Sequence, residues 1–196
     1  PTGDNFYDIT FKNALAGRYF SVSFDSDNGS GEVSSALTEG NIPFTLPASP
    51  AQKAGCVFGG WEKDGVLYPA GETCRTDKEC TFRAVWLKEE NAEAIFVNAS
   101  LGRDAAAGIG YGAPVKTFET ALSRAEQYGV SRIILTDLVS TNLSKLFFNG
   151  SLTVTAKDGE TQYDGGLINT VPLHLETPVT FEYMAMGSKA DCFVNT

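Results

Sequence analysis

The stretch CVFGGW, residues 56–61, places two glycines between a Phe and a Trp in an otherwise apolar run. Side chains of a regular strand alternate between its faces, so Phe58 and Trp61 would lie on opposite sides of a sheet. Glycine weakens a strand interior and often marks a bulge. A bulge at Gly59 and Gly60 absorbs one residue and brings both rings to one face. The sequence therefore predicts a β-bulge here, with both aromatics in a core.

Short alternating segments surround this stretch and indicate a small sheet. Apolar residues alternate with polar ones over 19–25 and 79–86, and again over 42–46, where flanking prolines favour an edge position. The segment 56–68 is typical of a hairpin that turns at Lys63, Asp64 and Gly65. These strands, within about seventy residues, suffice for an independent sheet domain.

The series YFSVSFDSDNGSGE, IPFTLPASPAQKAGCVFGGWEKDGVLYPAGE and TFRAVW resembles the Listeria and Bacteroides repeat family over residues 18–87. The resemblance implies a β-grasp-like module of bacterial surface proteins, used as a spacer or adhesive unit without catalytic residues. The chain departs from the family pattern at Cys56, where an aromatic is usual, and at Cys74 and Cys80. These departures favour a local disulfide between Cys74 and Cys80, and two free thiols are the alternative.

Residues 1–17 are expected to be an N-terminal lead or an upstream edge strand. Residues 88–94 are expected to be a polar linker, and the sequence pattern after them differs from that of the first domain. A strand at 95–97 is followed by a loop rich in Gly and Ala over 98–116. Apolar residues then recur at helical spacing, with Thr117 as the expected N-cap and Gly129 as the stop. A further strand begins at Ile133.

This second stretch resembles the entry of right-handed parallel β-helix proteins of the pectate-lyase-like class. The residues that carry the resemblance are Val97, Asn98, Gly102, Asp104, Gly108, Ala113, Pro114, Lys116, Thr117, Ala121 and Leu122. In that family the helix closes the first end of the solenoid, which covers an apolar cross-section and unpaired strand edges.

Alternating strands downstream, as in SLTVTAKDG and VTFEYMAMG, agree with this resemblance. The predicted fold class is thus mainly β: a small β-grasp-like sheet domain at 18–87, then the helix-capped start of a right-handed parallel β-helix at 95–196. Because the chain begins without Met and has room for only two or three rungs, we expect a piece of a larger protein whose solenoid is truncated.

The acidic composition limits the kinds of binding partner that the protein is expected to have. The 196 residues hold 24 acidic and 15 basic side chains, a formal charge of −9, which disfavours nucleic acid and anionic membrane surfaces. No apolar run reaches the roughly 18 residues of a membrane span, and no signal peptide is visible. We expect no cofactor.

The candidate binding residues are aromatic. Trp61, Tyr68 and Trp86 are suited to stacking on sugars; for Trp61 and Trp86 a place in the core of the small domain is favoured over ligand binding, and for Tyr68 both interpretations stay open. The single histidine, His174, is expected on the outer face of a strand and not in a catalytic triad.

Candidate metal ligands are carboxylates. Asp104 is expected to accept backbone N–H groups of the long loop, with a metal role as the weaker alternative. Acidic turns, which are either calcium sites or solvated turns, comprise Asp25, Asp27, Asp158, Glu160 and Asp164.

Together these observations favour a non-catalytic segment of a bacterial extracellular or cell-surface multidomain protein. It would act as a spacer, adhesion or glycan-binding module, with an extracellular glycan or a host protein as partner. The alternative is the N-terminal part of a secreted β-helix polysaccharide lyase or glycoside hydrolase, whose active site lies downstream.

Overall fold

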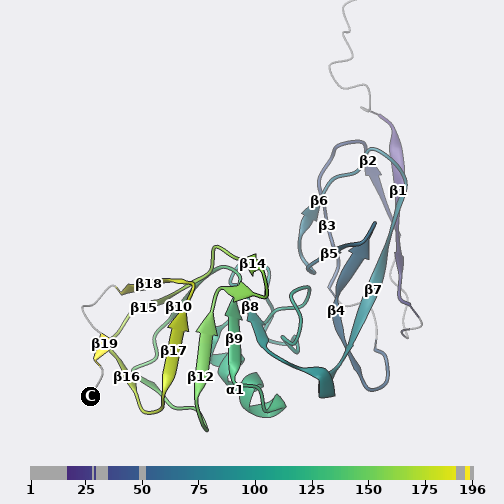
Figure 1. Ribbon diagram of the computed structural model, residues 1–196. Helices are drawn as coiled ribbons and strands as arrows, with labels where there is room; N and C mark the ends of the chain where they lie inside the picture. The colour runs from purple at the N-terminus through teal and green to yellow at the C-terminus, as the bar shows by residue number, and fades with distance from the viewer. Residues whose placement is uncertain (1–16, 28, 30–34, 49–51, 189–192, 195–196) are drawn as a thin grey trace, which may run out of the picture.

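The computed structural model describes residues 17–27, 29, 35–48, 52–188 and 193–194. Within them the chain is mainly β with one short α-helix, and its strands form two bodies that lie side by side (Figure 1). The predicted mainly β class is therefore confirmed. The lead or edge strand expected at 1–17 lies outside the described residues, apart from Gly17.

The N-terminal body is a five-stranded sheet in the order β2-β1-β7-β4-β5. Strand β1 runs parallel to β7, and the other neighbours are antiparallel. A separate antiparallel pair, β3 with β6, lies beside it. The bounds are β1 Tyr19–Asp25, β2 Ala36–Glu39, β3 Phe44–Thr45, β4 Cys56–Lys63, β5 Val66–Tyr68, β6 Thr73–Cys74 and β7 Cys80–Lys88.

The glycine pair in β4 forms the predicted bulge. Phe58 pairs with Trp86, and the next paired position is Gly60 with Val85, so the register against β7 shifts by one residue. Gly60 has a φ of 123°, in the region that favours glycine. Phe58 and Trp61 are both buried as a result, with ring centroids 5.2 Å apart. The prediction that both rings belong to the core is confirmed.

The β4–β5 hairpin also turns where expected. Strand β4 ends at Lys63 and β5 begins at Val66, and the two residues between them, Asp64 and Gly65, have φ values of 53° and 79°. Positive φ at both central positions is the type I′ geometry that matches strand twist, and Asp-Gly is a preferred pair for it.

The C-terminal body consists of parallel sheets. A four-stranded sheet has the order β17-β12-β9-β8, and two three-stranded sheets have the orders β10-β15-β18 and β11-β16-β19. The bounds are β8 Ile95–Val97, β9 Arg132–Leu135, β10 Leu138–Thr141, β11 Lys145–Leu146, β12 Leu152–Thr155, β15 Gly166–Asn169, β16 Leu173–Leu175, β17 Val179–Glu182, β18 Ala185–Ser188 and β19 Phe193–Val194. A small antiparallel pair, β13 Lys157–Asp158 with β14 Thr161–Gln162, lies between β12 and β15 along the chain.

These parallel strands pair in a repeating order along the chain. The first set is β9, β10 and β11, and the second set is β12, β15 and β16. In the second set β12 pairs with β9, β15 with β10 and β16 with β11. Strands β17, β18 and β19 repeat the step against β12, β15 and β16. The chain therefore returns to the same three sheets, each time after about 20 to 30 residues.

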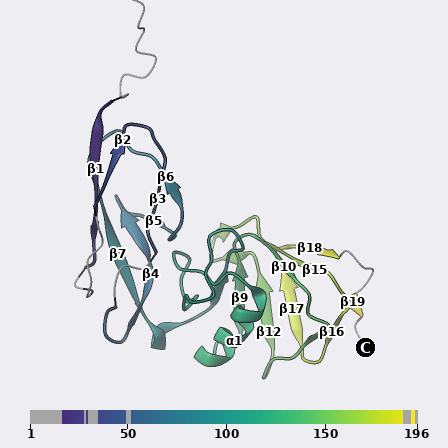
Figure 2. The same cartoon turned by 180° about the vertical axis from the view of Figure 1, so that it is seen from behind.

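Helix α1, Phe118–Tyr128, lies against β8, β9 and β10 (Figure 2). The Thr117 side chain accepts a hydrogen bond from the Thr120 backbone N–H, and Gly129 ends the helix with a φ of 67°. The predicted N-cap and stop are both confirmed. Phe118 and Ala121 are buried on the face that meets the strands, which follows from their helical spacing.

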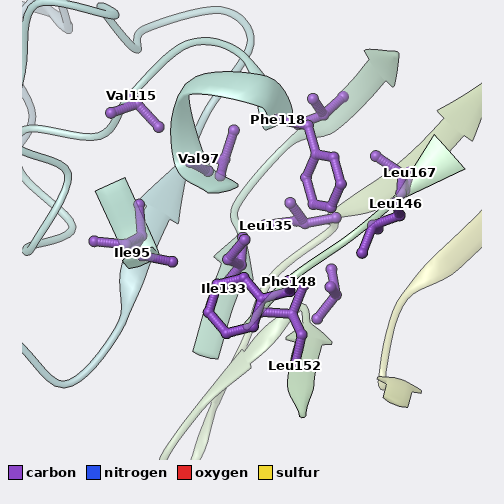
Figure 3. Close-up of a cluster of buried hydrophobic side chains, with 14 of the residues drawn as sticks. Ile95, Val97, Val115, Phe118, Ile133, Leu135, Leu146, Phe148, Leu152 and Leu167 are labelled. Carbon is purple, nitrogen blue, oxygen red and sulfur yellow. The ribbon is translucent and has the colours of Figure 1, made fainter. Parts of the chain in front are cut away.

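The core of the C-terminal body lies between α1 and the strand sets. In Figure 3 the ring of Phe118 points toward Leu135, with Val97 beside them, and Val115 of the 98–116 loop belongs to the same buried cluster. Further buried members come from later strands and loops, namely Leu146, Phe148, Leu152, Val154, Leu167 and Leu173. The helix thereby covers an apolar surface that the strands alone would leave open.

The two bodies are joined by more than the expected linker at 88–94. Lys88 ends β7, and Glu89–Asn91 form a single 3-10 turn. The 98–116 loop reaches back to the first body, where the Ala70 backbone N–H donates to the Gly112 carbonyl at 3.0 Å. Ala113 of this loop is buried in the core of the N-terminal body.

Candidate functional site

A cleft of about 920 Å³ opens where the two bodies meet. Its walls come from the start of β4 and its preceding turn, from the 98–116 loop and from α1. The charged side chains along it are Lys53, Glu89, Arg103 and Arg124, and the aromatic ones include Trp86 and Tyr128. The cleft is mostly cationic although the chain as a whole has a formal charge of −9.

Lys53 is tied to the wall of the N-terminal body. Its Nζ donates to the Asp27 carbonyl oxygen at 3.0 Å and to the Asp27 carboxylate at 3.3 Å, and it lies 6.0 Å from the centroid of the Trp86 ring. The Trp86 indole N–H donates to the Ser26 carbonyl at 2.9 Å. The charge of Lys53 is thus partly offset, and Trp86 is held in one orientation.

The two guanidinium groups make fewer contacts. Arg124 donates from Nη1 to the Gln127 side chain at 2.6 Å, while its Nε is buried without a hydrogen-bond partner in the described part of the chain. Arg103 is exposed: its backbone N–H donates to the Pro114 carbonyl and its carbonyl accepts from the Ala106 N–H, while its guanidinium forms no hydrogen bond with a described residue. Neither arginine forms an ion pair with a described residue.

The one carboxylate on the cleft wall has a partner. Tyr128 donates its hydroxyl to the Glu89 carboxylate at 3.3 Å. Burial, followed by the negative charge of Glu89, raises the pKa of Tyr128, so this phenol stays protonated and remains a donor. The wall therefore presents a neutral hydroxyl near Arg124, with its proton directed at Glu89.

Two of the candidate sugar-stacking residues lie elsewhere. Trp61 is completely buried, packs on Phe24 and Phe58, and donates its indole N–H to the Pro47 carbonyl at 2.9 Å. The ligand-binding alternative for Trp61 is corrected accordingly, because the bulge turns its ring inward. Tyr68 pairs with Trp61 across β4 and β5 and is half-buried, with its ring edge-on to Phe82 at 5.5 Å.

Asp104 has the structural role that was expected of it. Its Oδ1 accepts hydrogen bonds from the backbone N–H groups of Lys116 and Thr117 at 3.0 and 2.9 Å, and from the Thr117 hydroxyl at 3.0 Å. Burial acts to raise the pKa of Asp104, but these hydrogen bonds outweigh it and lower the pKa overall. The carboxylate thus pins the 98–116 loop to the start of α1.

The cysteines of the N-terminal body are free thiols in the structure. These are Cys56, Cys74 and Cys80, so the disulfide suggested between Cys74 and Cys80 is not formed. Both side chains pack at the edge of the aromatic core. Burial raises the pKa of Cys74 to about 11, which keeps its thiol protonated and weakly nucleophilic.

Three of the five acidic turn residues, Asp25, Asp27 and Asp158, pair with cations. Asp25 pairs with Arg83 at 3.5 Å, and Asp158 pairs with Arg132 at 3.3 Å. Among the residues that the structure describes, no group of three or more His, Cys, Asp or Glu side chains is arranged to hold a metal ion. His174 is exposed on β16, as predicted.

Sequence reasoning singled out Trp86 but missed the charged residues of the cleft. Arg103 directly precedes Asp104, and Arg124 lies on α1 outside its apolar face, so both belong to segments whose roles were otherwise identified. No local sequence signal could have grouped them, because Lys53 and Arg124 are 71 residues apart in the sequence and line one cleft only where the two bodies meet.

The described residues define a mainly β chain with one short helix and several parallel sheets in its C-terminal half. No family model matches the chain, and neither a curated protein nor a solved structure matches it. In the described residues, no helix is long and apolar enough to cross a membrane.

Proposed function

We propose that this chain is a non-catalytic segment of a bacterial extracellular or cell-surface multidomain protein. In this proposal residues 18–87 form a β-grasp-like repeat module, and residues 95–196 form the capped start of a right-handed parallel β-helix. The pair acts as a spacer that also carries an adhesive or glycan-binding surface.

The repeated parallel pairing supports the β-helix part of the proposal. Each set of strands lies in register beside the set before it, as with Leu138 beside Gly166 and Gly166 beside Ala185. A solenoid is built from such turns, which bury a continuous core between them. Helix α1 covers the end of the sheets at β8 and β9, where a solenoid needs a cap.

The observation that carries the spacer role is the close joint between the bodies. A spacer transmits orientation only if its parts do not rotate freely, and a flexible linker would allow rotation. Here the joint is a backbone contact: a Cβ on Gly112 would lie 2.1 Å from the Gly59 carbonyl oxygen and 2.6 Å from the Cα of Gly60. Together with the bond from Ala70 to Gly112, this contact supports a fixed arrangement.

Nitrogen-15 NMR relaxation on the whole chain tests the proposal. A fixed joint gives one rotational correlation time for amides of both bodies. In Gly112→Ala the added methyl group opens the joint, and the two bodies acquire separate, shorter correlation times. Gly187→Ala is the matched control, because a methyl group there meets only the Ile168 side chain at an ordinary 3.6 Å. Separate correlation times in the unmodified chain would refute the spacer role.

The alternative, the N-terminal part of a polysaccharide lyase or glycoside hydrolase, rests on the same parallel pairing. It is tested by incubating the intact multidomain protein with polysaccharides and following the absorbance of unsaturated products or the release of reducing ends. Turnover would favour the enzyme over the non-catalytic segment.

A further inference from the structure

The cleft between the bodies concentrates positive charge on an acidic protein. Of its four charged wall residues, three are cationic. Charges farther away than about 8 Å are largely screened at physiological salt, so a ligand in the cleft responds mainly to these nearby groups. An anionic ligand is therefore favoured there despite the net charge of the chain.

The positive charge that remains available comes from the two arginines. Lys53 already binds Asp27, and Glu89 already accepts from Tyr128. Arg103 and Arg124 have no carboxylate partner among the described residues, and the Nη2 of Arg124 makes no hydrogen bond to a described residue.

The buried Nε of Arg124 adds a second observation. A buried donor without an acceptor carries a desolvation cost, which an anionic acceptor beside the same guanidinium reduces. Guanidinium groups bind carboxylates through paired N–H donors in a fixed fork, and this geometry selects a planar anion.

The remaining wall suits the body of a sugar. Alanines 105–107 and Gly55 leave a smooth surface, and the half-buried rings of Trp86 and Tyr128 present apolar area beside polar tips. A volume of about 920 Å³ lies in the range that holds a ligand of a few rings. The Tyr128 hydroxyl, whose proton goes to Glu89, can accept a hydrogen bond from a sugar hydroxyl.

We infer that this cleft binds a short oligosaccharide bearing a sugar carboxylate, with Arg103 and Arg124 pairing with the carboxylate. The inference rests on the proposed adhesive function and names its ligand class. The carboxylate belongs either to a hexuronic acid or to a sialic acid, since both offer the same anion on a sugar ring.

Isothermal titration calorimetry on the whole chain tests the inference with four probes: a hexuronate trisaccharide, sialyllactose, lactose and a glutamate-rich heptapeptide. We expect binding of one or both acidic sugars and none of lactose. Arg103→Ala and Arg124→Ala each lower that affinity by about tenfold or more, as expected for loss of a charged hydrogen-bond pair.

The control variant is Arg83→Ala, which removes the same charge from β7 at a side chain outside the cleft that is 62% exposed. Circular dichroism and the melting temperature establish that each variant is folded. Unchanged affinity in both cleft variants overturns the inference, as does equal binding of lactose, preference for the peptide, or binding of no probe. None of these results bears on the correlation times that test the spacer role, so the two proposals fail independently.

Discussion

Gly60 and Gly112 meet backbone to backbone across the joint between the two bodies. A methyl group on Gly60 would lie 2.7 Å from the Cα of Gly112, closer than carbon atoms approach without displacement. The same Gly60 has a φ of 123° and completes the bulge in β4. One residue therefore serves the local strand geometry and the long-range contact, and both require the absence of a side chain.

Gly60→Ala is expected to lower the free energy of unfolding by about 2 to 4 kcal/mol, since it adds overpacking to backbone strain. Gly65→Ala measures backbone strain without a contact, because Gly65 has a φ of 79° and open space around it, although this φ is less restrictive than the 123° of Gly60. Its loss is expected to be about 1 kcal/mol. Urea unfolding measures both, and equal losses would show that the contact with Gly112 contributes nothing.

Trp61→Phe removes core volume and the donor that satisfies the Pro47 carbonyl. We expect a loss of about 2 to 3 kcal/mol in the free energy of unfolding. Trp86→Phe is the matched variant: it also deletes one indole hydrogen bond, to Ser26, but from a half-buried ring, so its loss is smaller. A larger loss for Trp86→Phe in urea unfolding would contradict the assignment of Trp61 to the centre of the core.

Asp104→Asn removes the charge that holds the start of α1. We expect a loss below about 1 kcal/mol, because the side chain is largely exposed and solvent screens its interactions. The pKa of Asp104 is lower in the folded state than its ordinary value of 3.8, so its contribution is present above that value and disappears as pH falls through the lower folded value.

The stability difference between wild type and Asp104→Asn should thus stay constant from about pH 5 to 8 and shrink below about pH 4. Amide hydrogen exchange at Lys116 and Thr117 gives a local readout, and exchange there should accelerate in the variant. A difference that grows on acidification is the contrary result.

Cys74 is expected to react slowly with iodoacetamide at pH 8. Its pKa of about 11 compares with an ordinary value of 9.0, so the thiolate population is about 100-fold lower in the folded chain than in urea. Mass spectrometry of the alkylated peptides measures the ratio. Equal rates would contradict the burial, and protection of both Cys74 and Cys80 that only a reductant removes would reveal the disulfide instead.

Local chemistry made much of the fold predictable from the sequence. The Asp64-Gly65 turn, the Thr117 cap, the Gly129 stop and the bulge each depend on residue types within a few positions. The mainly β class followed from alternating segments, because the two-residue period of a strand is written directly in the sequence.

Other features depended on contacts between distant segments. The pairing of β9 with β12 and of β12 with β17 joins strands separated by irregular turns, and no regular repeat in the sequence marks them. Whether Cys74 and Cys80 bond to each other, and how far Trp61 lies from solvent, likewise depended on packing.

By itself the sequence determined the positions of the hairpin turn, the helix ends and the β-bulge. Glycine, aspartate and threonine fix these features through their own backbone geometry or through hydrogen bonds with N–H groups a few residues away. Only the tertiary structure decided that the backbone of Gly60 also packs against that of Gly112, and that Arg103 and Arg124 line the same cleft as Trp86. The physical reason is that close approach and shared charge arise between segments far apart in the chain, and local propensity carries no information about them.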